Sequence, residues 1–163
     1  MKTIRLFPLE FGRLLQNRLT WLIVLLTVIS PAAGLFLYKP ATATTMLSLY
    51  LANPAIAGGV VGGILFGLLT IFELDRVSRS RADVLMDAAV SPLTMALVRL
   101  LALLAVAVVT VALTMLVWLP ISMHLIGSVF GGMDFVLAYL LLMGLALPLS
   151  ILAAAAAYQF TRR

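Results

Sequence analysis

The sequence of 163 residues contains no cysteine and few charged residues. The lack of cysteine excludes disulfides and thiolate metal ligands. Asp, Glu, Lys and Arg make up only 10% of the chain, whereas about 25% is usual for a soluble domain. Apolar residues make up 64%. Because a small soluble fold must cover a large surface with polar groups, this composition excludes a soluble globular domain, a disordered tail and a nucleic-acid-binding module.

The sequence also lacks the residue patterns of several chemistries. It has no Gly-x-x-x-x-Gly-Lys-Ser/Thr segment that could bind a nucleotide as a P-loop. No Asp, Glu, Lys, Arg or His falls inside the four apolar cores, which argues against a self-sufficient proton- or cation-coupled transporter. His124 is the only histidine, and no His-Glu pair or Ser-His set accompanies it. We therefore expect no enzymatic activity, no catalytic residue, no metal site and no cofactor.

What the sequence does contain is four long apolar segments. A helix needs about 20 apolar residues to cross the hydrocarbon core of a bilayer. The four predicted spans are residues 19–38, 54–72, 100–118 and 136–158. Pro148 is expected to kink the last span. Because these apolar runs are continuous, they do not fit the alternating strands of a membrane β-barrel. The sequence predicts an all-α fold, a single transmembrane helical bundle over residues 1–163.

The basic residues are distributed unevenly between the two ends of these spans. Ten of the eleven Lys and Arg residues precede the first span, lie between the second and third, or follow the fourth, and only Lys39 falls at the other end. Loops rich in Lys and Arg stay in the cytoplasm. We therefore expect both termini and the loop over residues 73–99 to be cytoplasmic, in a bacterial plasma membrane. This asymmetry explains the formal charge of +5 without a nucleic-acid partner.

The leader over residues 1–18 has the pattern of an amphipathic helix. Apolar residues recur at three- and four-residue spacing along residues 3–18. They are Ile4, Phe7, Phe11, Leu14 and Leu15. Such a helix can lie in the membrane interface with its cations near anionic headgroups. The alternative is a plain basic leader that only sets the topology.

The loop over residues 73–99 is long enough to hold a short cytoplasmic helix. Ser80 is suited to its N-cap. Charged residues at positions i, i+4 and i+8 would line one face as ion pairs. They are Arg79, Asp83 and Asp87. Ser91 followed by Pro92 reads as a fresh N-cap with proline at N1, so we expect the third helix to begin there. The alternative is a solvated loop that only separates two spans.

The second span contains five glycines in three overlapping small-xxx-small pairs. They are Gly58, Gly59, Gly62, Gly63 and Gly67. Glycine at this spacing lets another helix approach closely within lipid. We expect this helix-packing face to contact another helix of the same chain. A dimer seam and a flexible gating segment are the alternatives.

The loop and its flanks resemble the type-2 family of ABC transporter permeases. The similar features run in order along residues 1–120, from the basic amphipathic leader to the third span. They are the acidic-basic segment at residues 73–76, the segment at residues 81–85, Pro92-Leu93-Thr94 and Arg99. The resemblance implies that the short helix is a coupling helix that sits in a groove of a cytoplasmic ATPase. The ATPase contacts would be Arg79, Arg81, Asp83, Leu85, Met86 and Asp87.

This resemblance leads to a prediction of function. We expect a membrane-spanning permease subunit, or a truncated permease, of an ATP-driven ABC exporter. Its partners would be a separate ABC ATPase, the lipid bilayer and a second permease chain or homodimer. Members of the family usually have six spans, so a four-span chain implies a split permease or a bundle completed by another subunit. The alternative is a four-span scaffold or assembly protein without transport activity.

Overall fold

The computed structural model describes residues 2–37, 48–79 and 92–161. Within these ranges the chain is almost entirely helical and contains no strand. Four helical segments are long and apolar enough to cross a membrane. They are Arg18–Phe36, Tyr50–Arg76, Leu93–Val129 and Gly132–Thr161. The all-α prediction is confirmed, each predicted span overlaps one of these segments, and the chain has the architecture of a multi-pass membrane protein.

The described residues form ten helical elements. In chain order they are α1 (Lys2–Gln16), α2 (Arg18–Ile29), α3 (Pro31–Leu37), η1 (Ser48–Ala52), α4 (Asn53–Arg79), α6 (Pro92–Ile126), η2 (Gly127–Val129), α7 (Gly132–Ala138), η3 (Tyr139–Met143) and α8 (Gly144–Thr161). The start of α6 at Pro92 is the residue at which the sequence predicts the third helix to begin.

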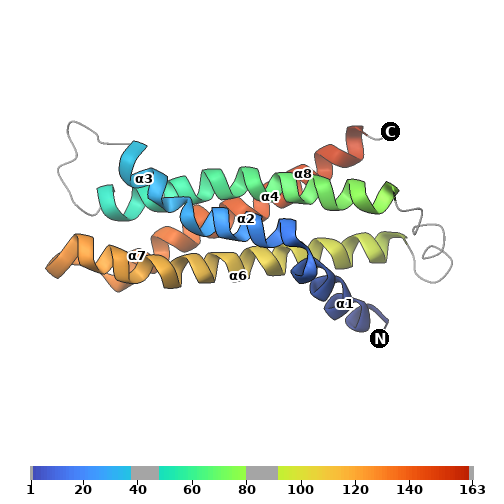
Figure 1. Cartoon of the computed structure of the whole chain (residues 1–163), viewed down its shortest axis with the longest axis horizontal. Coiled ribbons are helices and arrows are strands. Elements are labelled where there is room, and N and C mark those ends of the chain that lie inside the picture. The colour runs from blue at the N-terminus through green and yellow to red at the C-terminus, as the bar shows by residue number, and fades with distance from the viewer. Residues whose placement is uncertain (1, 38–47, 80–91, 162–163) are drawn as a thin grey trace.

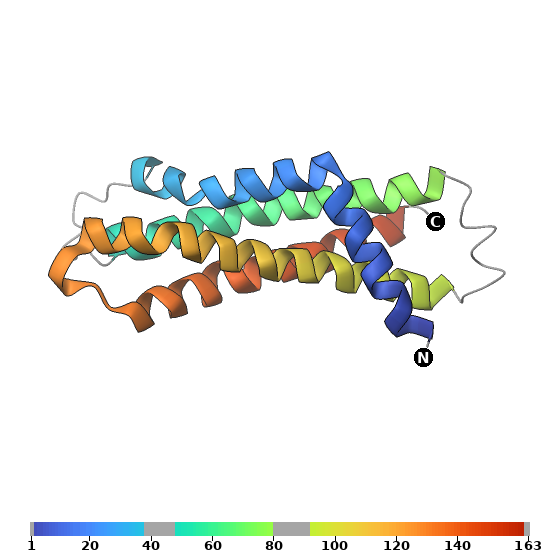
Figure 2. The same cartoon turned by 60° about the horizontal axis from the view of Figure 1, so that its bottom comes forward.

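The four spans form a bundle in which each span packs on at least two others (Figure 1). Helix α2 packs on α4 and on α6, and α8 packs on the same two helices from the opposite side. Helix α4 therefore contacts α2, α3 and α8, with α8 as its most extensive partner. Helix α1 leaves the bundle axis at a steep angle and packs on α6 (Figure 2).

Both ends of the chain lie at one end of the bundle. Helix α4 ends and α6 begins at this same end, beside α1 and the last turn of α8 (Figures 1 and 2). The end of α3 and the turn between α6 and α7 lie at the opposite end. The bundle therefore brings the basic leader and both flanks of the segment between the second and third spans to one end.

The first span is broken at Ser30, because Pro31 has no N–H to continue the helical hydrogen bonds. The carbonyl of Thr27, which loses this partner, accepts a hydrogen bond from the Ser30 hydroxyl at 2.7 Å. One residue later, the carbonyl of Val28 accepts a hydrogen bond from Trp118 Nε1 at 2.8 Å. The Val28 carbonyl beside the break is thus the acceptor of a hydrogen bond that joins α2 to α6.

The fourth span departs from regular helix before its proline. Pro148 lies inside α8, whereas the irregular turn is the π-helical segment η3 at Tyr139–Met143. The N–H of Gly144 donates to the carbonyl of Tyr139 across this wider turn. The span therefore contains a π-helical turn upstream of Pro148, and the kink expected at Pro148 itself stays a prediction.

Candidate functional site

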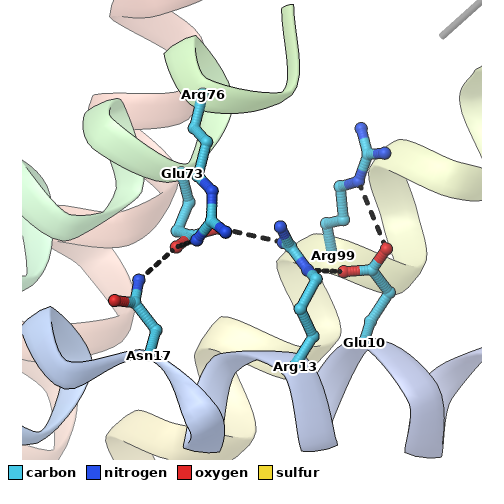
Figure 3. A network of polar contacts seen from close by, with 6 residues as sticks. All are labelled: Glu10, Arg13, Asn17, Glu73, Arg76 and Arg99. Carbon is cyan, nitrogen blue, oxygen red and sulfur yellow. Dashed lines mark hydrogen bonds and ion pairs between the residues drawn. The ribbon is translucent and has the colours of Figure 1, made fainter. Parts of the chain in front are cut away.

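A polar network joins α1, α4 and α6 at the end of the bundle where α4 ends and α6 begins (Figure 3). Its members come from segments far apart in the sequence. They are Glu10, Arg13 and Asn17 near the α1–α2 corner, Glu73 and Arg76 on α4, and Arg99 on α6.

Arg13 is the centre of this network. Its Nε lies 2.8 Å from Glu10 Oε2, and its Nη2 lies 2.9 Å from Glu73 Oε2. Glu10 is only 7% exposed and Glu73 only 6%. A buried carboxylate is unfavourable unless it is paired and hydrogen-bonded. The planar fork of one guanidinium therefore satisfies two buried carboxylates from different helices.

Asn17 fixes the corner between α1 and α2 and also contacts α4. Its Oδ1 accepts a hydrogen bond from the N–H of Leu19 at 3.1 Å, as an N-cap of α2. Its Nδ2 donates to Glu73 Oε1 at 2.9 Å. The side-chain amide of Asn17 therefore caps the start of α2 and hydrogen-bonds the Glu73 carboxylate on α4.

Two further arginines border the network at longer range. Arg76 Nη1 and Arg99 Nε each lie 3.7 Å from a carboxylate oxygen, of Glu73 and Glu10 respectively. The Arg76 side chain is 58% exposed, so solvent screens its ion pair and leaves it a small contribution. Three guanidinium groups face two carboxylates, which leaves this network with a net charge of +1.

The apolar face predicted for the leader is used partly inside the protein. Leu14 is buried in the main core cluster, and Phe7 and Phe11 pack against that cluster. The rings of these two phenylalanines stack with their centroids 5.8 Å apart. Glu10 is drawn inward beside them, whereas Leu9 is exposed. Helix α1 is therefore docked on the bundle by both apolar contacts and ion pairs.

Two glycines of the second span make very close approaches within the chain. A Cβ atom on Gly59 would lie 2.8 Å from the Leu142 carbonyl oxygen, and one on Gly62 would lie 2.8 Å from Thr27 Cγ2. Contacts this short have no room for a side chain without a shift of the neighbour. Gly59 therefore faces the fourth span, and Gly62 faces the first.

The other three glycines of that face have more room. A Cβ on Gly58 would lie 3.1 Å from Pro31 Cγ. One on Gly63 would lie 3.7 Å from Ser150 Cβ, and one on Gly67 would lie 3.9 Å from Ala154 Cβ. These last two distances are ordinary van der Waals contacts. All five glycines thus border neighbouring spans of the same chain, but the approach loosens toward Gly67.

The predicted ATPase contacts are only partly within the described residues. Arg79 is the last residue of α4. The other five lie outside the residues that the structure describes: Arg81, Asp83, Leu85, Met86 and Asp87. What the structure does describe is the pair of helix ends on either side of them, and the polar network joins these two ends.

Sequence reasoning missed the network as a unit. In the sequence Glu10, Arg13 and Asn17 belong to the leader over residues 1–18, and Glu73 and Arg99 lie at the two ends of the loop over residues 73–99. The available signals were the Glu10–Arg13 spacing of three residues, which allows an ion pair on one helix face, and an asparagine directly before an apolar helix. Neither signal indicates that the leader contacts the helix ends that flank the loop over residues 73–99.

Within the described part of the chain, no group of three or more acidic or histidine side chains could hold a metal ion. Comparison with known proteins adds no identity: no family model, no curated protein and no solved structure matches this chain. The arrangement of the four helices and the network at their common end are therefore the observations from which a function is argued.

Proposed function

We propose that the chain is a membrane-spanning permease subunit, or part of a split permease, of an ATP-driven ABC exporter in a bacterial plasma membrane. The observation that carries this proposal is the Glu10–Arg13–Glu73 ion-pair chain between α1 and α4, extended to α6 by Arg99. It connects the helix ends that flank the segment resembling a coupling helix. That segment would sit in a groove of a separate cytoplasmic ATPase.

The network suits the transmission of movement between an ATPase and the spans. A displacement between α4 and α1 that separated Glu73 from Arg13 would leave a buried acceptor without this partner, which typically costs about 1–3 kcal/mol or more. The helix ends would therefore move together with α1 rather than independently. In this proposal ATP-driven closure of the ATPase displaces the coupling segment, and α1, α4 and α6 respond as one unit.

The charge distribution of the described residues supports a cytoplasmic position for this end of the bundle. Arg13, Arg76 and Arg99 belong to the network at this end, and Arg18 begins α2 directly after the network residue Asn17. Basic residues near the ends of spans favour the cytoplasmic side. Both termini are cytoplasmic in this proposal, and α1 lies at the membrane surface with its remaining apolar side chains toward lipid.

A second permease chain fits the outer side of the third and fourth spans. The fourth span is the least buried of the four in this bundle, with 28% of its apolar window buried against 39% for each of the others. A groove of about 180 Å³ runs between α6 and the fourth span, and its lining includes Ala107, Ala112 and Gly144. Small residues of this kind allow close approach of another transmembrane helix.

Purification of the tagged chain from its native membranes tests this proposal. Proteins that remain bound in mild detergent would be identified by mass spectrometry. We expect a partner with a P-loop and a signature sequence of ABC ATPases, present in a fixed ratio to the chain after size-exclusion chromatography. Recovery of the chain with stoichiometric partners that have no nucleotide-binding sequence would contradict the proposal and favour the scaffold alternative.

A further inference from the structure

A narrow cleft lies between α1, α2 and α6, below the corner at Asn17. Its volume is about 30 Å³. Its walls come from Phe11 and Leu15 on α1, Trp21 and Val24 on α2, and Val106, Val109 and Leu113 on α6, with two threonines between them. Apart from these threonines, the lining consists of aliphatic and aromatic side chains. The cleft therefore suits an apolar chain rather than a polar solute.

The two threonines of the cleft, Thr20 and Thr110, differ in the hydrogen bonding of their hydroxyl groups. Thr110 donates to the Val106 carbonyl at 2.8 Å, as threonine commonly does one turn back in a helix. Thr20 is only 1% exposed, and its hydroxyl has no partner among the described residues. It lies in the first turn of α2, where the Asn17 carbonyl already accepts hydrogen bonds from the N–H groups of Thr20 at 3.1 Å and Trp21 at 3.5 Å. A buried donor without an acceptor favours a ligand that supplies one.

An exposed cation, Arg18, begins α2 two residues before the cleft residue Thr20. Arg18 is exposed and forms no ion pair with any residue that the structure describes. It lies three residues before Trp21, hence on nearly the same side of α2. The Trp21 side chain is 53% exposed, and its Nε1 donates to the Leu15 carbonyl at 2.6 Å. Arginine and tryptophan at the end of a transmembrane helix are typical of headgroup depth.

We propose that this corner binds one anionic phospholipid. The phosphate pairs with Arg18, an ester carbonyl accepts the hydrogen bond of Thr20, and one acyl chain follows the cleft beside Trp21 and Val24. Residues 18 to 24 of α2 cover about 9 Å of depth at about 1.5 Å per residue, which matches the passage from phosphate through ester to acyl chain. This site does not depend on the proposed transport role.

The two tryptophans of the chain allow a direct test. Trp118 is buried on α6 and does not line the cleft. The W118F variant therefore leaves Trp21 as the only indole of the chain. This variant would be reconstituted in phosphatidylcholine vesicles that contain a small fraction of brominated phosphatidylglycerol or, in parallel, brominated phosphatidylcholine. Bromine quenches indole fluorescence at contact. We expect phosphatidylglycerol to quench Trp21 at an about fivefold lower mole fraction, the equivalent of about 1 kcal/mol per basic residue at a membrane surface.

Two further variants distinguish lipid binding at Arg18 from a general effect of the positive charge of the protein. R18Q in the W118F background should abolish the preference for phosphatidylglycerol, whereas R163Q removes one charge elsewhere and should preserve it. Equal quenching by the two lipids, or the same loss with R163Q, would overturn the proposal. In case W118F unfolds, native mass spectrometry of the unaltered chain provides the second measurement. One retained phosphatidylglycerol that is lost in R18Q alone supports the site, and retention unchanged by R18Q refutes it.

Discussion

Arg13 places its guanidinium between the carboxylates of Glu10 and Glu73, 2.8 Å from the first and 2.9 Å from the second. The two acids are 63 positions apart in sequence and lie on different helices. Both acids are buried, and without Arg13 each would keep only a longer ion pair, Glu10 with Arg99 and Glu73 with Arg76, both at 3.7 Å. The relationship makes α1 an integral part of the helical bundle and joins it to the end of the second span.

Removal of Arg13 should therefore destabilise the protein. The R13Q variant leaves two buried carboxylates without their shared guanidinium, and we expect a loss of about 1–3 kcal/mol in the free energy of unfolding. The matched control is R76Q, since Arg76 is 58% exposed and its nearest carboxylate contact is 3.7 Å. Thermal unfolding in detergent would measure both. Equal midpoints for R13Q and R76Q would contradict the central place of Arg13.

The glycine face offers a graded test of packing. A leucine at Gly59 or Gly62 would collide with the Leu142 carbonyl or the Thr27 side chain, so we expect each variant to lose about 1–3 kcal/mol or to fail to accumulate. Alanine at Gly67 meets Ala154 Cβ at 3.9 Å and should be tolerated. Expression level and thermal stability in detergent are the measurements. A G59L variant as stable as G67A would show that the approach at Gly59 is not close.

The orientation in the membrane is open to cysteine labelling, because the chain contains no cysteine of its own. Cysteine at Ser80, next to the end of α4, should react only from the cytoplasmic side. Cysteine at Ser128, an exposed position in the turn after α6, should react with an impermeant reagent from outside. Intact cells and opened vesicles would be compared. Labelling of S80C in intact cells would contradict the proposed topology, because it would place this loop outside the cell.

Local features of the sequence predicted the helices well. The long apolar runs located all four spans, and Pro92 marked the start of α6, because both signals depend only on neighbouring residues. The break at Ser30 was not predicted, although Pro31 carries its physical cause: a missing N–H frees the Thr27 carbonyl. In a long apolar run, composition outweighs a single proline, and the break became visible only through its hydrogen bonds.

Lateral contacts were harder to predict than spans. Five closely spaced glycines indicate close approach but do not name the partner, since lipid, a second chain and another span are all apolar. The polar network could not be predicted from the sequence for a different reason. Its bonds join Asn17 and Arg13 to Glu73, and no periodicity within either segment encodes how α1 turns at Asn17. Only the folded arrangement brings these charges together.

The central functional claim depends on a cytoplasmic ATPase bound at the loop between α4 and α6. Apolar anchors in a partner's groove usually dominate such an interface, while charges at its rim contribute less. The most direct measurement is the amount of the ATPase captured by detergent-purified L85D, with R79A as the matched control and with capture corrected for the expression of each variant. We expect a strong loss of capture with L85D, since the change buries a charge in an apolar groove, and a weak loss with R79A. Unchanged capture with L85D would contradict binding of the ATPase at this loop.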